Sequence, residues 1–208
     1  MTKEKKDELV TAGELKQRQL RDPEWVASKL AEDARWEEKQ ALLKELEAPL
    51  EQELKESGVV VKSYRHVIDR PHNFRVAIPI LISHMQMDKY PELTKNFMAQ
   101  AIAMKEANIY WDTIVQIFKS AAGKSPIFAQ GLATALSKAW KEPQLEQLIE
   151  LCENESYGDA RVLLANGLRK SKDNRAEAAL LKLSSDPYIG PQVTKWLRKK
   201  PSDKKLTH

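Results

Sequence analysis

Two interleaved series of short apolar segments recur along residues 74–200 with a shared period of about 33 residues. The first series begins at Ile78, Ile114, Leu148 and Leu180, and the second begins at Ala99, Ala129, Ala165 and Thr194. Each segment lies in an amphipathic stretch, and Pro, Gly, Asn or Ser residues separate one stretch from the next. A helix pair of this length cannot bury its apolar face alone, so neighbouring pairs must shelter each other. The spacing therefore predicts an all-α fold of stacked helix pairs.

The first 56 residues depart from this pattern and predict a separate helical region. Asp22 followed by Pro23 indicates a helix start, because Asp caps free backbone amides and Pro fits the first helical turn. We expect Pro49 to kink or end this helix. The predicted regions are a charged helical arm or cap at 1–56, a linker with a short helix at 57–73, the repeats at 74–200 and a basic tail at 201–208.

Two glycines in the second series constrain how the predicted helices pack. Gly131 and Gly167 lie within helices, where a glycine costs about 1 kcal/mol relative to alanine. We therefore expect close approach of an adjacent helix, or a local bend, at both positions.

Residues 157–165, with the sequence Tyr-Gly-Asp-Ala-Arg-Val-Leu-Leu-Ala, resemble the "D-x-x-V-R-x-x-A-x-x-A-L" helix of the HEAT-repeat family with positions shifted. The segment Ser185-Asp186-Pro187-Tyr188 is similar to the turn between helices in that family. The resemblance covers about residues 74–200. It implies a right-handed, armadillo-like α-solenoid in which the second helix of each pair lines the concave side.

Charge is distributed unevenly along the chain, although the net charge is only +4. Residues 1–60 carry 11 Lys and Arg against 15 Asp and Glu, whereas residues 161–208 carry 12 against 4. The acidic start and the basic end of the chain either steer an acidic partner toward the basic end or are ordinary solvated helix faces.

Polar residues at matching positions of the second series form a predicted ladder on the concave side. The candidate partner-binding residues are Gln100, Gln130, Thr134, Asn166, Arg169, Lys170, Lys195 and Lys199. Their alternative role is structural, as side chains that hydrogen-bond between neighbouring helices and loops.

Residues 109–115, with the sequence Ile-Tyr-Trp-Asp-Thr-Ile-Val, resemble the "W-W-D-x-V-D" segment of HEAT-repeat alkylpurine DNA glycosylases. In that family the last Asp is catalytic and aromatic residues hold the damaged nucleoside. Here Val115 occupies the catalytic position, and an aliphatic side chain cannot stabilise a developing oxocarbenium ion. The resemblance implies an aromatic site at Tyr110, Trp111 and Asp112 without glycosylase activity. Helical spacing alone predicts instead that Trp111 belongs to the core.

The sequence contains no complete enzyme motif that we can identify. The segment 123–125, Gly-Lys-Ser, lacks the upstream glycine of a phosphate-binding loop, and no nucleophile elbow is present. The histidines lack metal-ligand spacing, and the single cysteine, Cys152, excludes an internal disulfide. We expect no cofactor and no metal. No stretch approaches the roughly 20 apolar residues that span a bilayer, and no signal peptide is recognisable, so we expect a cytoplasmic protein.

Two functional hypotheses remain, beside the weaker one of an enzyme whose site the sequence does not reveal. The first is a non-enzymatic protein that binds another protein with an acidic surface on the concave side of a HEAT-like solenoid, as an adaptor or a toxin-immunity protein does. The alternative is a catalytically inactive DNA- or RNA-binding relative of the glycosylases, because the basic C-terminal third could neutralise phosphates.

Overall fold

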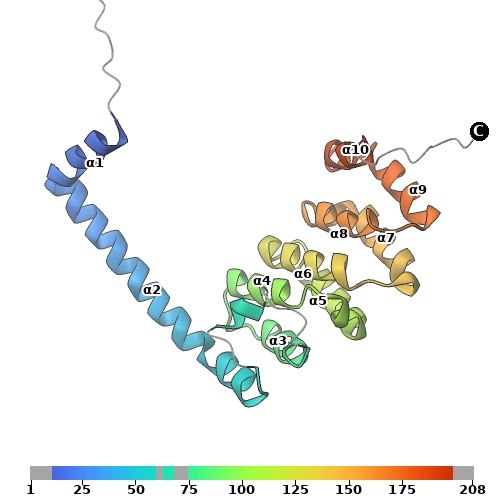
Figure 1. Ribbon diagram of the computed structural model, residues 1–208, viewed down its shortest axis with the longest axis horizontal. Helices are drawn as coiled ribbons and strands as arrows, with labels where there is room; N and C mark the ends of the chain where they lie inside the picture. Colours follow the sequence, from blue (N-terminus) through green and yellow to red (C-terminus); the bar gives the residue numbers. More distant parts are fainter. Residues whose placement is uncertain (1–10, 60–62, 68–74, 199–208) are drawn as a thin grey trace, which may run out of the picture. The chain divides into compact units, whose positions relative to one another are not determined.

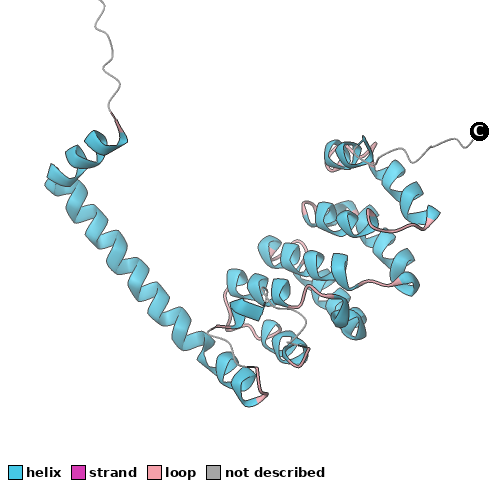
Figure 2. Cartoon of the chain, in the orientation of Figure 1, coloured by secondary structure: helices cyan, strands magenta, loops and turns pink. Residues whose placement is uncertain are grey.

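The computed structural model describes residues 11–59, 63–67 and 75–198 (Figure 1). Within these ranges every regular element is a helix and no strand is present, which confirms the predicted all-α class (Figure 2). The predicted basic tail and the candidate residue Lys199 lie outside the described residues. The chain divides into two compact units, residues 1–47 and 48–208.

The described part of the first unit contains α1 (Ala12–Arg21) and the beginning of α2 (Pro23–Glu56). The boundary between the two units lies within α2, after residue 47. The backbone N–H of Glu14 donates to the Thr11 hydroxyl, and the Thr11 N–H donates to the Glu14 carboxylate at 2.9 Å. This capping box accounts for the start of α1. Asp22 accepts a 3.0 Å hydrogen bond from the backbone of Glu24, which confirms the predicted start of α2.

The helix α2 continues through Pro49, so the proline does not end it. The turns beyond the proline belong to the second unit, and there Leu50 and Leu54 are 0% and 1% exposed. Their burial offsets the hydrogen bond that a proline removes from a helix. Gly58 then follows the helix with a φ of 85°, a conformation that glycine adopts without strain.

The described residues of the second unit contain eight further α-helices: α3 (Ala77–Met85), α4 (Glu92–Ala101), α5 (Trp111–Ala121), α6 (Pro126–Ala139), α7 (Leu145–Glu153), α8 (Ala160–Leu168), α9 (Asn174–Leu183) and α10 (Gly190–Arg198). A short 3₁₀ helix, η1 (Tyr64–Val67), precedes α3, and others lie between the α-helices at η3 (Lys105–Tyr110), η4 (Glu142–Gln144) and η5 (Glu155–Tyr157). Each of the eight apolar segments predicted from the sequence lies on its own α-helix, in the predicted order, although the segment that begins at Ala99 extends one residue past α4.

The α-helices of this unit pack as antiparallel neighbours and also along two rows (Figure 1). α3 contacts α4, α5 contacts α6, α7 contacts α8 and α9 contacts α10. In one row α4 packs on α6, α6 on α8 and α8 on α10, while in the other row α7 packs on α9. The core therefore lies between successive helix pairs, as the period of the apolar segments predicts.

Polar contacts between distant residues of this unit also span about one period. Arg75 donates to Glu106, Asn108 to Gln144, Arg175 to Glu146 and the hydroxyl of Tyr188 to Asp159, over separations of 31, 36, 29 and 29 residues. The carboxylate of Glu92 accepts from the backbone N–H of Ile127, 35 residues later, at the start of α6. These contacts connect one helix pair to the pair that follows it.

Gly131 and Gly167 lie where neighbouring helices approach most closely. A Cβ on Gly131 would stand 2.8 Å from the backbone oxygen of Asn96 on α4. A Cβ on Gly167 would stand 3.0 Å from the backbone of Ser137 on α6. The close approach predicted from both glycines is confirmed, because no side chain fits without moving a neighbouring backbone.

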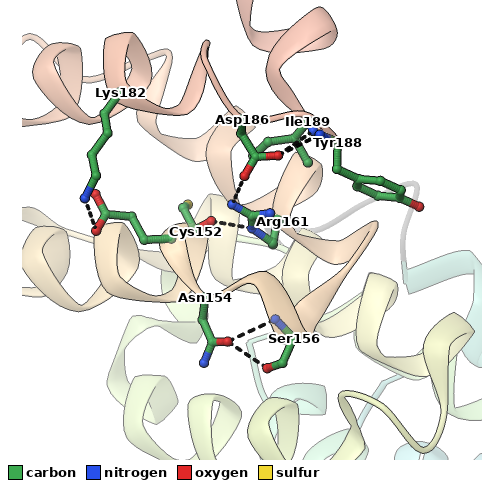
Figure 3. A network of polar contacts seen from close by, with 9 residues as sticks. Cys152, Asn154, Ser156, Arg161, Lys182, Asp186, Tyr188 and Ile189 are labelled. Carbon is green, nitrogen blue, oxygen red and sulfur yellow. Dashed lines mark hydrogen bonds and ion pairs between the residues drawn. The ribbon is translucent and has the colours of Figure 1, made fainter.

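A buried ion pair connects the third helix pair to the fourth (Figure 3). Arg161 on α8 is 3% exposed; it donates to the backbone oxygen of Cys152 on α7 at 2.7 Å and to Asp186, between α9 and α10, at 2.6 Å. Asp186 also accepts from the backbone N–H groups of Tyr188 and Ile189. The Ile189 N–H, followed by Arg161, holds the pKa of Asp186 below its ordinary value.

The C-terminal end of α2 is held within the second unit by a buried histidine. His84 of α3 is 3% exposed, its Nδ1 lies 2.6 Å from the Tyr90 hydroxyl, and its Nε2 lies 2.8 Å from the Glu53 carboxylate. Both ring nitrogens therefore have partners, and the residue is structural.

Candidate functional site

The polar residues predicted on the second helices lie on successive helices but do not form a ladder of hydrogen bonds. Gln100, Gln130, Thr134 and Asn166 are half-buried on α4, α6 and α8. The amide of Gln100 donates to Asn96 of its own helix at 3.2 Å, and the Thr134 hydroxyl donates to the backbone of Gln130 at 2.9 Å. Both bonds lie within a single helix rather than between neighbouring helices.

The predicted basic residues divide between different places. Arg169 donates to Asn166 at 2.9 Å, and its guanidinium carbon lies 4.8 Å from the ring centroid of Trp196 on α10, so a cation–π contact holds it. Lys195 lines a separate pocket of about 700 Å³ beside α9 and α10, which Asp186 also lines. Lys170 is in neither place.

The glycosylase-like segment is not an open aromatic cradle. Trp111 is 3% exposed and its indole N–H donates to Gln147 of α7, while Val115 is also 3% exposed. Tyr110 is half-buried and Asp112 lies exposed in the first turn of α5. The prediction that Trp111 belongs to the core is therefore confirmed.

Lys170 contributes to a larger groove, which we call the lysine groove. It has a volume of about 1010 Å³ and follows the segments that leave the C-terminal ends of α4, α6 and α8. Five of its lining residues are lysines: Lys105, Lys138, Lys141, Lys170 and Lys172. The groove thus receives positive charge from segments that follow three α-helices.

The lysines of the groove are exposed, and none of them forms an ion pair with a carboxylate in the described ranges. Two of the three acidic lining residues have cationic partners outside the groove. Glu106 pairs with Arg75 at 3.1 Å, and Asp173 pairs with Arg175 at 2.7 Å. The hydrogen bonds from Arg175 hold the pKa of Asp173 below its ordinary value. The groove is therefore electropositive.

Helix dipoles explain only part of this lysine pattern. Lys138 in the last turn of α6, and Lys141 and Lys170 just beyond α6 and α8, complement the negative ends of helix dipoles. Lys105 and Lys172 lie further along the chain, beyond the last turns of α4 and α8. The effect of a helix dipole falls off within the last turn, so local helix stability does not account for these two.

The groove also has an apolar surface. Trp140 is half-buried at the end of α6, and Met104 and Leu145 are 6% and 0% exposed. The indole nitrogen of Trp140 would lie 3.2 Å from a Cβ on Gly167, so the ring packs against the backbone of α8. The chain thus holds one partly exposed aromatic ring among the lysines.

Most residues of the lysine groove were not identified from the sequence. Of the candidates named there, only Lys170 lines it. The missed signal is the repeat period applied to charged residues: Lys138 follows Lys105 by 33 positions, and Lys172 follows Lys138 by 34. Apolar periodicity identifies buried faces, whereas these lysines lie at helix ends and in connecting segments.

A metal site, a reactive thiol and a membrane-spanning helix each lack support in the described part of the chain. No group of three or more His, Cys, Asp or Glu side chains there is arranged to hold a metal ion. Burial raises the pKa of the Cys152 thiol, which disfavours the nucleophilic thiolate. None of the helices described has both the length and the apolar character needed to cross a membrane.

The chain was also compared with known proteins. No family model matches it, and neither the curated proteins nor the solved structures yield a match.

Proposed function

We propose that the chain is a HEAT-like α-solenoid that binds an acidic region of a partner protein in the lysine groove, without catalysing a reaction. In this proposal the lysines act as a set of point charges, and the successive repeats hold them at fixed spacing. Adaptors and toxin-immunity proteins are the two kinds of binding protein that such a surface would suit.

The packing of the second unit supports the solenoid. Its helices alternate between two rows, and its long-range polar contacts join residues about one period apart. Both features follow when each pair packs on its sequence neighbours, as in proteins built from helical repeats.

The unpaired lysines carry the proposal for an acidic partner. Five ammonium groups line one groove and lack carboxylate partners among the described residues, and two of them, Lys105 and Lys172, lie beyond the reach of the nearby helix dipoles. Like charges close together repel one another, and a bound acidic segment would relieve that repulsion.

A nucleic acid is the second candidate, because the same lysines could neutralise phosphates. Lysine pairs with carboxylate and with phosphate alike, so the charges of the lining suit either partner. Capture from lysate treated with nuclease distinguishes the two.

Affinity capture tests the proposal with two charge-matched variants. The variant K141E/K170E reverses two charges of the lysine groove, and the control K119E/K124E reverses two exposed lysines elsewhere in the same unit. We expect the unchanged chain and the control to retain one acidic protein from nuclease-treated lysate, and the groove variant to lose it. Retention of nucleic acid alone, or equal retention by both variants, would contradict the proposal.

A further inference from the structure

We infer that the lysine groove takes an extended peptide with an acidic residue at about every third position and an apolar side chain between two of them. The inference rests on the proposed function and narrows it, because an acidic partner could also bind through a helix or a folded surface. Two features of the groove carry it: the spacing of the lysines and the position of Trp140.

The lysines form three groups along the groove, one for each repeat. Lys105 follows α4, Lys138 and Lys141 flank the end of α6, and Lys170 and Lys172 follow α8. Helices that pack side by side lie about 8–10 Å apart, so the groups should be separated by about that distance. A peptide in the extended polyproline II conformation has three residues per turn and rises about 3.1 Å per residue, so carboxylates at every third position lie on one side and about 9 Å apart. One acidic side chain can then meet each group.

Trp140 supplies the apolar position. Its chain position lies between Lys138 and Lys141, and Met104 and Leu145 line the same groove. The ring packs against Gly167, which has no side chain, so the backbone of α8 supports it and fixes its place. An apolar side chain of the peptide that covers the exposed part of this ring would distinguish the ligand from a simple polyanion.

Fluorescence anisotropy on the full chain tests these features with three labelled peptides of about 12 residues, a length that exceeds the groove. The first carries Glu at every third position and one central Phe among Ser and Gly. The second has the same composition with its Glu residues adjacent, and the third replaces the Phe of the first with Ser. A single-stranded oligothymidylate of similar length serves as the polyanion.

We expect the first peptide to bind about fivefold more tightly than the second, because its carboxylates match the lysine groups. We expect it to bind about tenfold more tightly than the third, because the Phe covers Trp140. K141E/K170E should lose binding of the first peptide, and K119E/K124E should keep it.

The remaining outcomes separate the inference from the proposed function. Equal affinity for all three peptides, with loss in K141E/K170E, overturns the extended spaced mode and leaves an acidic protein partner in place. Binding of the oligonucleotide in preference to every peptide contradicts both. Absence of binding to any probe overturns the inference, while capture of an acidic protein through the groove would still support the function.

Discussion

The helix α2 passes from the first unit of the chain into the second, and its apolar side chains differ in exposure between the two. In the second unit Leu50 and Leu54 are 0% and 1% exposed. In the first unit Leu30, Trp36 and Leu42 of the same helix are 65%, 62% and 64% exposed. A continuous helix therefore places apolar residues in a core at one end and leaves them open at the other.

The difference shows that helix formation and burial have separate causes in this chain. Local interactions define the helices of the first unit: the capping box at Thr11, the cap at Asp22 and the ion pairs of Lys29 with Glu32 and Asp33. Each such interaction contributes little, and a helix that packs on nothing is only marginally stable in water. The second unit adds neighbours that bury apolar area, so we expect most of the stability to depend on its contacts.

We expect the largest loss of stability from Asp186→Ala in the second unit. Removing this carboxylate leaves the guanidinium of Arg161 buried without its counter-ion and removes acceptors for two backbone amides. Breaking a buried ion pair in this way costs about 3–5 kcal/mol in the free energy of unfolding, which urea denaturation measures. The control is Asp159→Ala, which removes one exposed hydrogen bond from Tyr188 and should cost about 1 kcal/mol.

The same ion pair should give the unfolding free energy a defined pH dependence. The pKa of Asp186 is lower in the folded chain than its ordinary value of 3.8, mainly through the Ile189 N–H. Its stabilising contribution is therefore present above about pH 4 and is lost as pH falls through the folded pKa. The difference between the unchanged chain and Asp186→Asn should shrink on acidification below about pH 4. A constant difference would show that the carboxylate charge is not what stabilises this contact.

The next largest effect should come from Gly167→Leu. A Cβ alone already meets the backbone of Ser137 at 3.0 Å, so a leucine must push α6 and α8 apart. Overpacking of this kind costs about 3 kcal/mol, which should appear as a lower urea midpoint and lost cooperativity in the last two pairs. Gly13→Leu is the matched change in the first unit, where a Cβ would have no neighbour closer than 4.0 Å. Equal losses in the two variants would contradict the packing register.

The sequence predicts the helix order well because apolar spacing is a direct consequence of burial. The eight recurring segments and the two interior glycines each mark a place where one helix must face another, and the structure has them there. The capping box at Thr11 also has a sequence signature, because a Glu follows the Thr by three positions. The sequence predicts that Pro49 kinks or ends the helix, with a continuation to about Lys55, and Pro49 does not end it. The burial of Leu50 and Leu54 that supports the continuation depends on tertiary neighbours that the local sequence does not reveal.

The candidate site was harder to predict because the position of a charged residue in the sequence does not show which residue it contacts in the fold. Arg161 lies within an apolar helix, and only the structure shows that Asp186, 25 positions later, neutralises it. Arg169 and Lys195 share a basic region of the sequence, yet one stacks on Trp196 and the other lines a different pocket. The lysine groove arises where loops of three repeats meet, so its composition depends on how the repeats pack.

Along α2, Leu50→Ala should lower the free energy of unfolding by about 2–3 kcal/mol, because a fully buried leucine is replaced by a cavity. The effect should be smaller than that of Gly167→Leu, since residues near the end of a helix can relax into the space. Urea denaturation followed by circular dichroism measures it. Unchanged stability would mean that the end of α2 does not pack in the second unit.

The smallest effect should come from Trp36→Ala on the same helix, because a side chain that is 62% exposed loses little burial when it is removed. We expect a change within about 0.5 kcal/mol, set mainly by the higher helix propensity of alanine. The measurement should be repeated over a range of protein concentrations. A loss above about 1 kcal/mol that grows with concentration would show that Trp36 is buried between copies of the chain, since association stabilises the folded state by mass action. The exposed side chains of the first unit would then form an interface, and the contrast between the two units would hold only for the isolated chain.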